Sequence, residues 1–594
     1  MSRTHPFTAV GRPERRQSVL LATLLIVILV FAGRLVYVQA IIGPALAQVA
    51  RAERTDTIEL VAPRGEILDA DGVVLATTVE TYDVRVDLRQ IPDFRLYDEN
   101  STVVGWGAAA AAEVLAPVLD AAPNELGAQL VGDDGYFLLT KGVSPEVWQA
   151  IAALRVNGVT SERIGARVYP NGNTAGNVLG WVNADGAGAA GLEYTLQDRL
   201  VGTDGETTVE IGAAGQVIPT GQQSTVAAQA GCTVHTTIDS DLQWRTQSVL
   251  DDSVSRFGAE WGAVVVWEVK TGRILALADS ESVNPNNPLA SDENDRGARS
   301  VQGVYDPGSS GKVLTVLSAL EEGVVTPTSP IEDPYRLTTA NGQVVTDHTP
   351  HPDQVLTTTG VLYESSNTGT VNIGSLMTNE TRYQYMRQFG WGARTELGLP
   401  GESAGLLTPY DQWDGRQQYT TMFGQGLSVT LVQNTAVFAT VANQGMHLDP
   451  RIVDGYTCAD GVYQALVPAE PTQVVSPESS QEMINMLESV VDDGGTGTRA
   501  AIEGYRIAGK TGTAQIPDGA GGITDVAASF VGIAPADDPE IAVGVVIYRP
   551  SSGIYGGTIA APVFHDVAAF ALQSLGVPPS SEPATPYPLT PDAP

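Results

Sequence analysis

The segment Asp306-Pro307-Gly308-Ser309-Ser310-Gly311-Lys312 is followed by an apolar run. Pro307 and Gly308 favour a turn into a helix, which places Ser309 and Lys312 three residues apart on one helical face. A serine at a helix N-terminus lies beside free backbone N–H groups and the positive end of the helix dipole. This position suits a nucleophile whose reaction creates an oxyanion. Lys312 would be its base, provided that burial and a second cation keep the amine neutral.

Lysine is rare in this chain. Of the 33 basic residues only four are lysines, at positions Lys141, Lys270, Lys312 and Lys510. Arginine serves wherever a generic cation suffices, so a retained lysine indicates a need for an amine that can lose its proton. Retention by chance is the alternative for any one of them. Two of the four lie in the motifs described here.

A second motif is Glu364-Ser365-Ser366-Asn367-Thr368-Gly369. The Ser365 hydroxyl and the Asn367 amide, two residues apart on a loop, can face one site. By themselves they are also ordinary turn residues.

The third motif is Ala508-Gly509-Lys510-Thr511-Gly512-Thr513-Ala514, and Tyr505–Ala508 predicts a strand that enters it. Strand residues two apart share a face, so Thr511 and Thr513 point the same way. Together with Lys510 they suit a substrate carboxylate. A plain Gly-Thr-rich strand is the alternative.

Two patterns compete with these motifs. Gly504–Thr511 matches the phosphate-loop pattern G-x-x-x-x-G-K-[ST], but no helix is predicted after Thr511, so we interpret it as coincidence. Lys270-Thr271-Gly272 lies between two apolar strands and predicts a hairpin turn.

His348 and His351 have no third histidine or cysteine nearby, which favours a solvated loop over a metal site.

The N-terminal region predicts a membrane anchor. Residues 1–18 carry four arginines against one acid, and Val19–Val38 is apolar except for Arg34. Twenty residues span a bilayer as a helix, and the preceding positive charges place the N-terminus in the cytoplasm. A cleaved signal peptide is the alternative, since Ala45-Leu46-Ala47 resembles a cleavage site, although it lies well beyond the apolar run.

Composition narrows the remaining choices. The chain has 594 residues and a formal net charge of -35, which argues against a nucleic-acid binder. Cys232 and Cys458 allow at most one intramolecular disulfide, and its formation stays open.

The pattern of apolar and turn residues predicts a hairpin turning at Asp71-Gly72, a helix over Ala108–Leu115 that ends before Pro117, and a closing helix over Phe564–Gln573. Further strands are expected at 263–268, 273–278, 528–533 and 541–547, and further helices at 313–320 and within 424–443.

Ser-x-x-Lys, Ser-x-Asn and Lys-Thr-Gly, in that order, resemble the active-site motifs of penicillin-binding proteins and serine β-lactamases. From about residue 18 to 575 the chain looks like a class B penicillin-binding protein, and 397–405 looks closest to division-type septal D,D-transpeptidases of actinobacteria. Residues 64–76, 167–180 and 191–205 resemble the family's non-catalytic motifs. The chain departs from the family at Leu431, where proline is usual, and at Gly311, where a bulky residue is usual.

The resemblance implies an α+β multidomain fold: an N-terminal transmembrane helix, an elongated β-rich pedestal, and a penicillin-binding transpeptidase domain with an antiparallel sheet flanked by helices. The expected parts are a cytoplasmic tail (1–18), an anchor (19–40), a stalk and dimerisation-type pedestal (41–230), the transpeptidase domain (233–575) and a disordered Pro-rich tail (576–594).

The resemblance also implies a serine D,D-transpeptidase that cross-links peptidoglycan stem peptides through an acyl-enzyme and is acylated by β-lactams, without metal or cofactor. It implies catalytic roles for Ser309, Lys312, Ser365, Asn367 and Lys510. Substrate-binding roles fall to Thr511, Gly512 and Thr513. In this account Lys510 lowers the pKa of Lys312 by repulsion, and Asn367 orients the substrate and the lysine.

The implied partners are the cytoplasmic membrane, a membrane glycan polymerase and other division proteins, with the catalytic domain outside the membrane. Two other classes of function remain open. One is an inactive wall-associated scaffold or β-lactam sensor, which would be expected to have a damaged motif set. The other is a phosphate-loop nucleotide hydrolase, which needs a cytoplasmic active domain.

Overall fold

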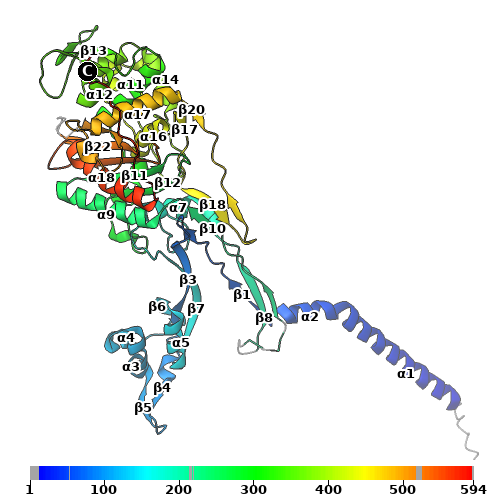
Figure 1. Ribbon diagram of the computed structural model, residues 1–594. Helices are drawn as coiled ribbons and strands as arrows, with labels where there is room; N and C mark the ends of the chain where they lie inside the picture. The colour runs from blue at the N-terminus through cyan, green and yellow to red at the C-terminus, as the bar shows by residue number, and fades with distance from the viewer. Residues whose placement is uncertain are drawn as a thin grey trace, which may run out of the picture. The chain divides into compact units, whose positions relative to one another are not determined.

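The computed structural model describes residues 13–52, 54–212, 217–218, 220–221, 223–516 and 525–591. The chain divides into two compact units, one of residues 1–62 and 203–229 and one of residues 63–202 and 230–594 (Figure 1). Residues 203–229, which the sequence analysis assigned to the stalk and pedestal (41–230), pair with the segment that follows the N-terminal helix.

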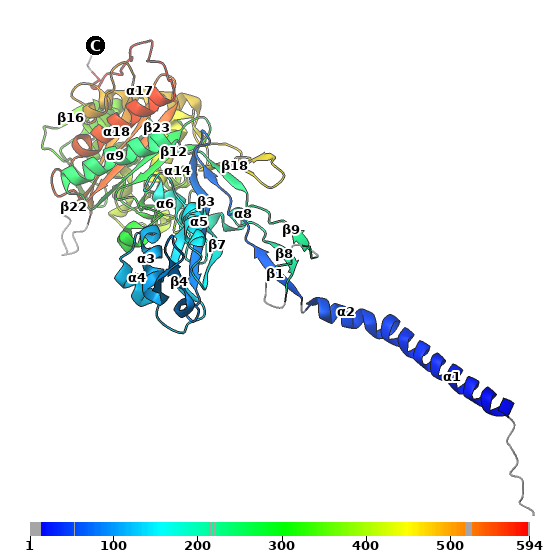
Figure 2. The ribbon, with the colours of Figure 1, turned by 90° about the horizontal axis from the view of Figure 1, so that it is seen from below.

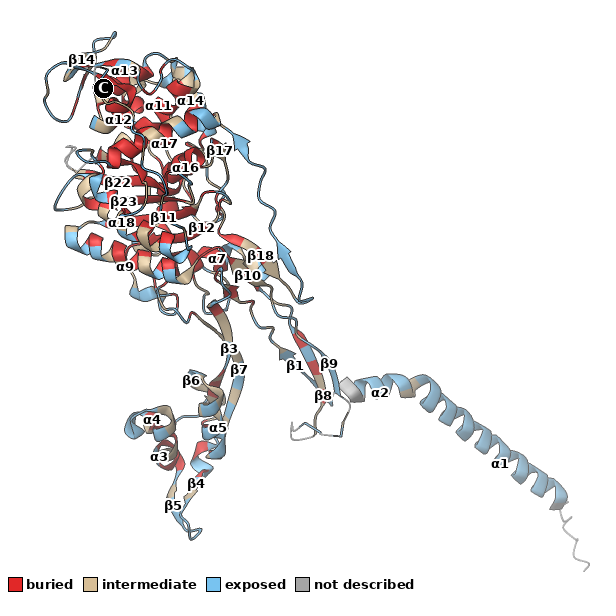
Figure 3. Ribbon diagram, in the orientation of Figure 1, coloured by how far each residue is buried: buried red, intermediate tan, exposed pale blue. Residues whose placement is uncertain are grey.

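The first unit begins with a continuous helix made of α1 (Pro13–Val36), a π-helical turn η1 (Tyr37–Ile42) and α2 (Gly43–Ala52). Among the described residues it is the one helix long and apolar enough to cross a membrane, and its surface is exposed (Figure 3). The predicted anchor lies within it. After α2, strand β1 (Thr55–Leu60) pairs with β8 (Gly205–Glu210), which pairs with β9 (Gln223–Val226).

The second unit begins with the pedestal, built on the long strand β3 (Val74–Val86). The predicted hairpin is confirmed: β2 (Ile67–Leu68) returns as β3 after a turn at 71–72. Strand β6 (Phe137–Val143) pairs with the far end of β3, and β7 (Val159–Val168) pairs with β3 from Thr77 to Val86. Helices α3 (Gly107–Leu119), α4 (Pro123–Gln129) and α5 (Pro145–Ala153) belong to the same part of the chain.

The predicted end of the helix before Pro117 is wrong. Helix α3 continues through Pro117 to Leu119, and the N–H of Asp120 closes it on the carbonyl of Ala116. Leu115 and Ala116 are buried in the pedestal core. Their packing holds the last turn despite the hydrogen bond that proline removes.

One buried carboxylate joins the three pedestal segments that resemble family motifs. Glu193 lies in α7 (Gly191–Thr195), which precedes α8 (Gln197–Leu200), and its side chain is fully buried. It accepts hydrogen bonds of 2.6 Å from both Arg64 and Arg167 and one of 3.2 Å from the hydroxyl of Tyr169. The two cations balance a charge that would be too costly to bury alone.

Within residues 233–575 the second unit contains a five-stranded antiparallel sheet in the order β12-β11-β23-β22-β21. Its strands are β11 (Trp261–Glu268), β12 (Ile274–Asp279), β21 (Ala508–Ile516), β22 (Asp525–Ala534) and β23 (Ile541–Tyr548). Strand β21 is therefore one of the two edge strands of the sheet. Because the strands are buried on both faces, their sequences are nearly continuous apolar runs.

Helices cover both faces of this sheet. Helices α9 (Ser240–Phe257) and α18 (Gly556–Ser574) lie side by side on one face (Figures 1 and 2). Helices α16 (Leu431–Ala442) and α17 (Pro477–Val491) pack on the other. Beyond them lie α11 (Lys312–Glu321), α12 (Thr358–Glu364), α13 (Asn367–Gly374) and α14 (Asn379–Gln388). This arrangement sets the N-terminus of α11 against the edge strand β21.

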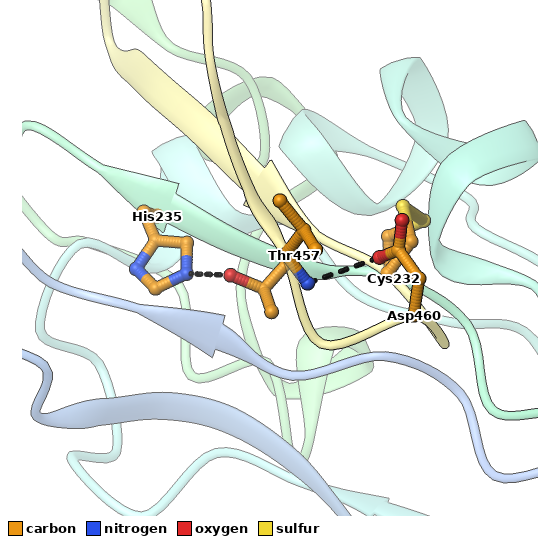
Figure 4. The surroundings of a disulfide bond; sticks show 6 residues. Cys232, His235, Thr457 and Asp460 are labelled. Atoms are coloured by element: carbon orange, nitrogen blue, oxygen red, sulfur yellow. Dashed lines mark hydrogen bonds between the residues drawn. A yellow bond between two sulfur atoms is a disulfide. The ribbon is translucent and has the colours of Figure 1, made fainter.

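Cys232 and Cys458 form a disulfide (Figure 4). The bond joins the start of β10 (Thr233–Thr236) to the end of β18 (Val453–Thr457), and these strands pair with each other. Beside it the His235 ring nitrogen and the Thr457 hydroxyl are 2.9 Å apart. Strand β10 also pairs with β2, so the bond fastens the β18 hairpin to the pedestal sheet.

Three boundaries differ from the sequence prediction. The strand expected at 505–508 begins only at Ala508, because 503–504 form a turn and the Arg506 guanidinium pairs with Glu488 at 2.7 Å. Helix α18 begins at Gly556 and continues through Pro562. The tail from residue 576 was predicted to be disordered, but over 577–589 it contacts residues of 233–575. A Pro-rich segment cannot form a core of its own, but the carbonyls of Val577 and Pro588 accept hydrogen bonds and Tyr587 packs against the main core.

Candidate active site

Ser309 lies on a short 3-10 turn, η5 (Gly308–Gly311), which leads directly into α11. The side chain is half-buried, and its hydroxyl has no hydrogen-bond partner among the described residues. Gly308 has φ of +56°, and a Cβ there would lie 2.9 Å from the carbonyl oxygen of Thr513. Only glycine allows η5 to approach strand β21 this closely.

Lys312 is the first residue of α11 and is fully buried. Its ammonium donates to the Ser365 carbonyl and lies 3.3 Å from the Ser365 hydroxyl. Burial lowers the pKa of Lys312 to about 7, against the opposing charges of Asp347 and Asp333. An amine with this pKa is available as a base near neutral pH.

The Ser365 hydroxyl lies between two lysines. Lys510 on β21 donates to it at 3.0 Å and also lies 3.2 Å from the Thr511 hydroxyl. Lys510 is fully buried; its burial and the charge of Lys312 both lower its pKa well below the ordinary value. Burial and repulsion by Lys510 were both expected to lower the pKa of Lys312. The structure confirms burial as the cause, whereas the repulsion between the two lysines lowers the pKa of Lys510.

Strand β21 supplies the opposite wall of the site. The Thr511 hydroxyl donates to Thr496 at 3.1 Å, and the Thr513 hydroxyl accepts from the N–H of Gly556 at 3.3 Å. Gly512 lies between them, where an added Cβ would meet the Pro307 carbonyl at 2.7 Å. As an edge strand, β21 has backbone groups that face away from the sheet and are free to pair with an extended ligand.

Asn367 is the predicted residue whose contacts differ most from its expected role. Its side-chain amide donates to the Thr346 carbonyl at 3.0 Å, and its backbone N–H donates to Asp347. Among the described contacts it has none with Lys312. The side chain is half-buried, and its carbonyl oxygen accepts no hydrogen bond among the described residues.

Sequence reasoning missed the network behind the second motif. The buried carboxylates of Asp333 and Asp347 accept hydrogen bonds from the Ser366 and Thr368 hydroxyls. His351 lies 3.0 Å from Asp347. Burial opposes the shift, but a hydrogen bond to its own neighbouring backbone and the two carboxylates raise the pKa of His351.

Asp333, Asp347 and His351 form the one group of described side chains with the composition of a metal site. Their polar atoms are already used to hold the loop that carries Ser365 and Asn367. The loop expected to be solvated is therefore partly buried at Asp347. No sequence pattern marked this network, because its carboxylates come from two separate segments. Asp333 ends β13 (Pro330–Asp333), and Asp347 directly follows β15 (Val344–Thr346).

A second contact that sequence reasoning missed supports η5, the turn that carries Ser309. Asn434 on α16 donates to the Ser310 hydroxyl at 3.0 Å and to the Tyr305 hydroxyl at 3.1 Å. Ser310 in turn donates to the Pro307 carbonyl at 2.8 Å. This chain of hydrogen bonds fixes Ser310, the residue that follows Ser309, to helix α16 and to the turn at Pro307.

The two competing patterns are resolved by the backbone. Thr511 lies within strand β21, which continues to Ile516, whereas a phosphate loop would begin a helix at this point. The interpretation of the pattern as a coincidence is confirmed. Lys270 lies in the turn between β11 and β12 and pairs with Glu540 at 2.5 Å. The hairpin prediction for 270–272 is confirmed.

Comparisons with known proteins agree with this architecture. The family model described as the penicillin binding protein transpeptidase domain matches residues 262–569. The model described as the penicillin-binding protein dimerisation domain matches residues 59–236.

Similar proteins cover most of the chain. The chain is 38% identical over 473 residues to penicillin-binding protein PbpB of Mycolicibacterium smegmatis, covering 78% of this chain and 73% of that one. It is 32% identical over 575 residues to peptidoglycan D,D-transpeptidase FtsI of Escherichia coli, covering 95% and 93%. A crystal structure of penicillin binding protein 3 from Mycobacterium tuberculosis, complexed with aztreonam, matches with TM-score 0.69 and 29% identity over 90% of this chain and 100% of that one.

Proposed function

Because the chain belongs to the penicillin-binding protein transpeptidase family, we propose that it is a serine D,D-transpeptidase that cross-links peptidoglycan stem peptides at the division septum. The observation that carries this proposal is the Ser365 hydroxyl, which bridges the two buried lysines, Lys312 and Lys510. It unites three motifs that are far apart in sequence. The free hydroxyl of Ser309 lies at the start of the same helix as Lys312.

In the proposed reaction neutral Lys312 takes the proton of Ser309, whose oxygen attacks the penultimate carbonyl of a stem peptide ending in D-Ala-D-Ala. The backbone N–H groups of Ser309 and Thr513 stabilise the oxyanion. The close approach of Gly308 to the Thr513 backbone supports this pairing. The new ester bond forms as the peptide bond to the terminal D-Ala breaks.

Ser365 passes the proton from Lys312 to the leaving amine of D-Ala. This role is supported by its position between two amines of lowered pKa. Lys510, Thr511 and Thr513 bind the terminal carboxylate, and Asn367 accepts from the substrate amide. An amine of a neighbouring strand then attacks the ester and releases Ser309.

We infer further that the N-terminal helix is a single membrane anchor with its basic end in the cytoplasm. The second compact unit then works outside the membrane, next to the wall. The assignment to division is supported by the name of the Escherichia coli relative. A glycan polymerase and other division proteins are the partners this role requires.

The proposal is tested with a stem-peptide thioester and a D-amino acid acceptor. The full chain should release the leaving group and form the new amide, with aminolysis faster than hydrolysis. Ser309→Ala should abolish both reactions. Hydrolysis alone would indicate a carboxypeptidase, and no turnover by folded protein would favour an inactive scaffold.

A further inference from the structure

The C-terminal segment, residues 577–591, crosses the transpeptidase domain, and we call it the strap. Its first contact is with the turn before β21. The Tyr505 hydroxyl donates to the Val577 carbonyl at 2.7 Å, and the Arg506 N–H donates to the Ser580 hydroxyl at 3.0 Å. This contact fixes the point where the strap leaves α18.

The second contact is at the N-terminus of α12. Thr357, the N-cap residue, donates its N–H to the Leu589 carbonyl at 3.0 Å and its hydroxyl to the Pro588 carbonyl at 2.6 Å. Tyr587 is half-buried against the main hydrophobic core. Figure 1 shows α12, on which this part of the strap lies, next to β13. The strap therefore ends on the helix that leads to the second active-site motif.

The sequence of α12 is adapted to this contact. Gly360 lies inside the helix, where glycine costs about 1 kcal/mol relative to alanine. A Cβ at this position would lie 2.2 Å from the Leu589 carbonyl oxygen. The strap thus occupies the space that a side chain at position 360 would fill.

The other end of α12 is the catalytic end. The helix closes at Ser365, which is in the left-handed conformation and offers its carbonyl to Lys312 and its hydroxyl to both lysines. With only seven residues, α12 transmits a shift of its first turn directly to its last. Thr358 and Thr359 also bond to the loop at 327–329, so loss of the strap should displace the helix without unfolding it.

We propose that the strap is a positioning element for Ser365, and that its removal slows acylation without weakening the initial binding of a β-lactam. The readout of acylation rests on the proposed function. A misplacement of about 1 Å at a reacting group can cost about a hundredfold in rate.

The test compares two truncations of the full chain in detergent. One ends at residue 585 and removes the Thr357 contact; its matched control ends at 591 and keeps it. With a chromogenic cephalosporin, the first should acylate at least about tenfold more slowly than the control, with an unchanged dissociation constant for the non-covalent complex. Equal acylation constants would overturn the proposal, and so would a loss of affinity alone.

Gly360→Ala supplies a second variant that leaves the tail in place. In the full chain the added methyl group displaces the strap, so acylation should slow as in the truncation. In the chain ending at 585 the same substitution should slow nothing further and should raise the thermal midpoint, because alanine favours the helix. An equal loss of rate in both backgrounds would show direct damage to α12 and contradict the proposal.

Hydrogen exchange separates this proposal from the proposed function. Removal of 586–594 should speed exchange of the α12 amides about tenfold or more and leave α16 unchanged. If the unaltered chain is not acylated at all, the proposed function fails, and the exchange result alone decides whether the strap holds α12. Unchanged exchange in α12 would overturn the strap proposal.

Discussion

At the scale of the residue, the site depends on a lysine whose pKa is lowered by burial, so that much of its amine is uncharged near neutral pH. Lys312 is fully buried, and its pKa is about 7. Arginine in its place would stay charged, which explains why lysine persists here in a chain that otherwise uses arginine.

The lowered pKa predicts the pH dependence of acylation. Lys312 acts as a base only when deprotonated, so the acylation rate constant should fall about tenfold per pH unit below about 7 and level off above it. Stopped-flow measurement with a β-lactam checks this, with the thermal midpoint recorded at each pH as the control. A rate constant that stays flat through this range would contradict the assignment of Lys312 as the base.

Glu193 predicts a stability effect far from the chemistry. Glu193→Gln leaves two buried guanidinium groups without their counter-charge, which should lower the free energy of unfolding by about 3–5 kcal/mol. Denaturant unfolding measures this. Glu162→Gln is the matched control, since Glu162 forms a half-exposed pair with Arg85 and should change stability by about 1 kcal/mol or less. Similar losses in the two variants would contradict the account.

At the scale of the element, the disulfide fastens the β18 hairpin to the pedestal sheet and closes a loop of 226 residues. Replacing Cys232 and Cys458 together by serine should destabilise the chain by up to about 5 kcal/mol, mainly by freeing the unfolded chain. Unfolding of the double variant and of the parent, each with and without reductant, measures the loss. An unchanged midpoint, or an equal response of both proteins to reductant, would contradict this role.

Local patterns predicted most elements but not their partners. The hairpin at 71–72, the strands of the sheet and the helix after Ser309 follow from apolar periodicity and turn residues. Periodicity could not show that Pro117 lies within a packed helix, or that a Pro-rich tail is held by Thr357. Both depend on contacts between distant segments.

The active site shows the same limit. Ordered motifs named the residues that meet at Ser365, since each motif carries its chemistry locally. Asp333 and Asn434 were missed because each is an ordinary residue in its own segment and gains its role only from the fold. The expected contact of Asn367 with Lys312 failed for a related reason: the Thr346 carbonyl takes its amide.

At the scale of the whole molecule, the second compact unit contains all the residues of the candidate active site. The chain leaves it for residues 203–229 and returns at a point where Thr203 and Gln229 are paired by a 2.8 Å hydrogen bond. The excursion can therefore be closed by a short linker. A chain lacking 1–62 and 204–228 should be soluble and acylated by a β-lactam at the rate of the full chain. Misfolding, or a rate well below that of the full chain, would contradict the division.

The central claim is that Ser309 is an acyl-forming nucleophile. Its most direct test is the mass of the intact chain after incubation with a β-lactam, followed by peptide mapping of the adduct. We expect one stable adduct on Ser309, no adduct in Ser309→Ala, and an unchanged adduct in Ser318→Ala, a serine of the same helix whose hydroxyl donates to the Leu314 carbonyl. An adduct on another residue, or none on folded protein, would contradict the claim.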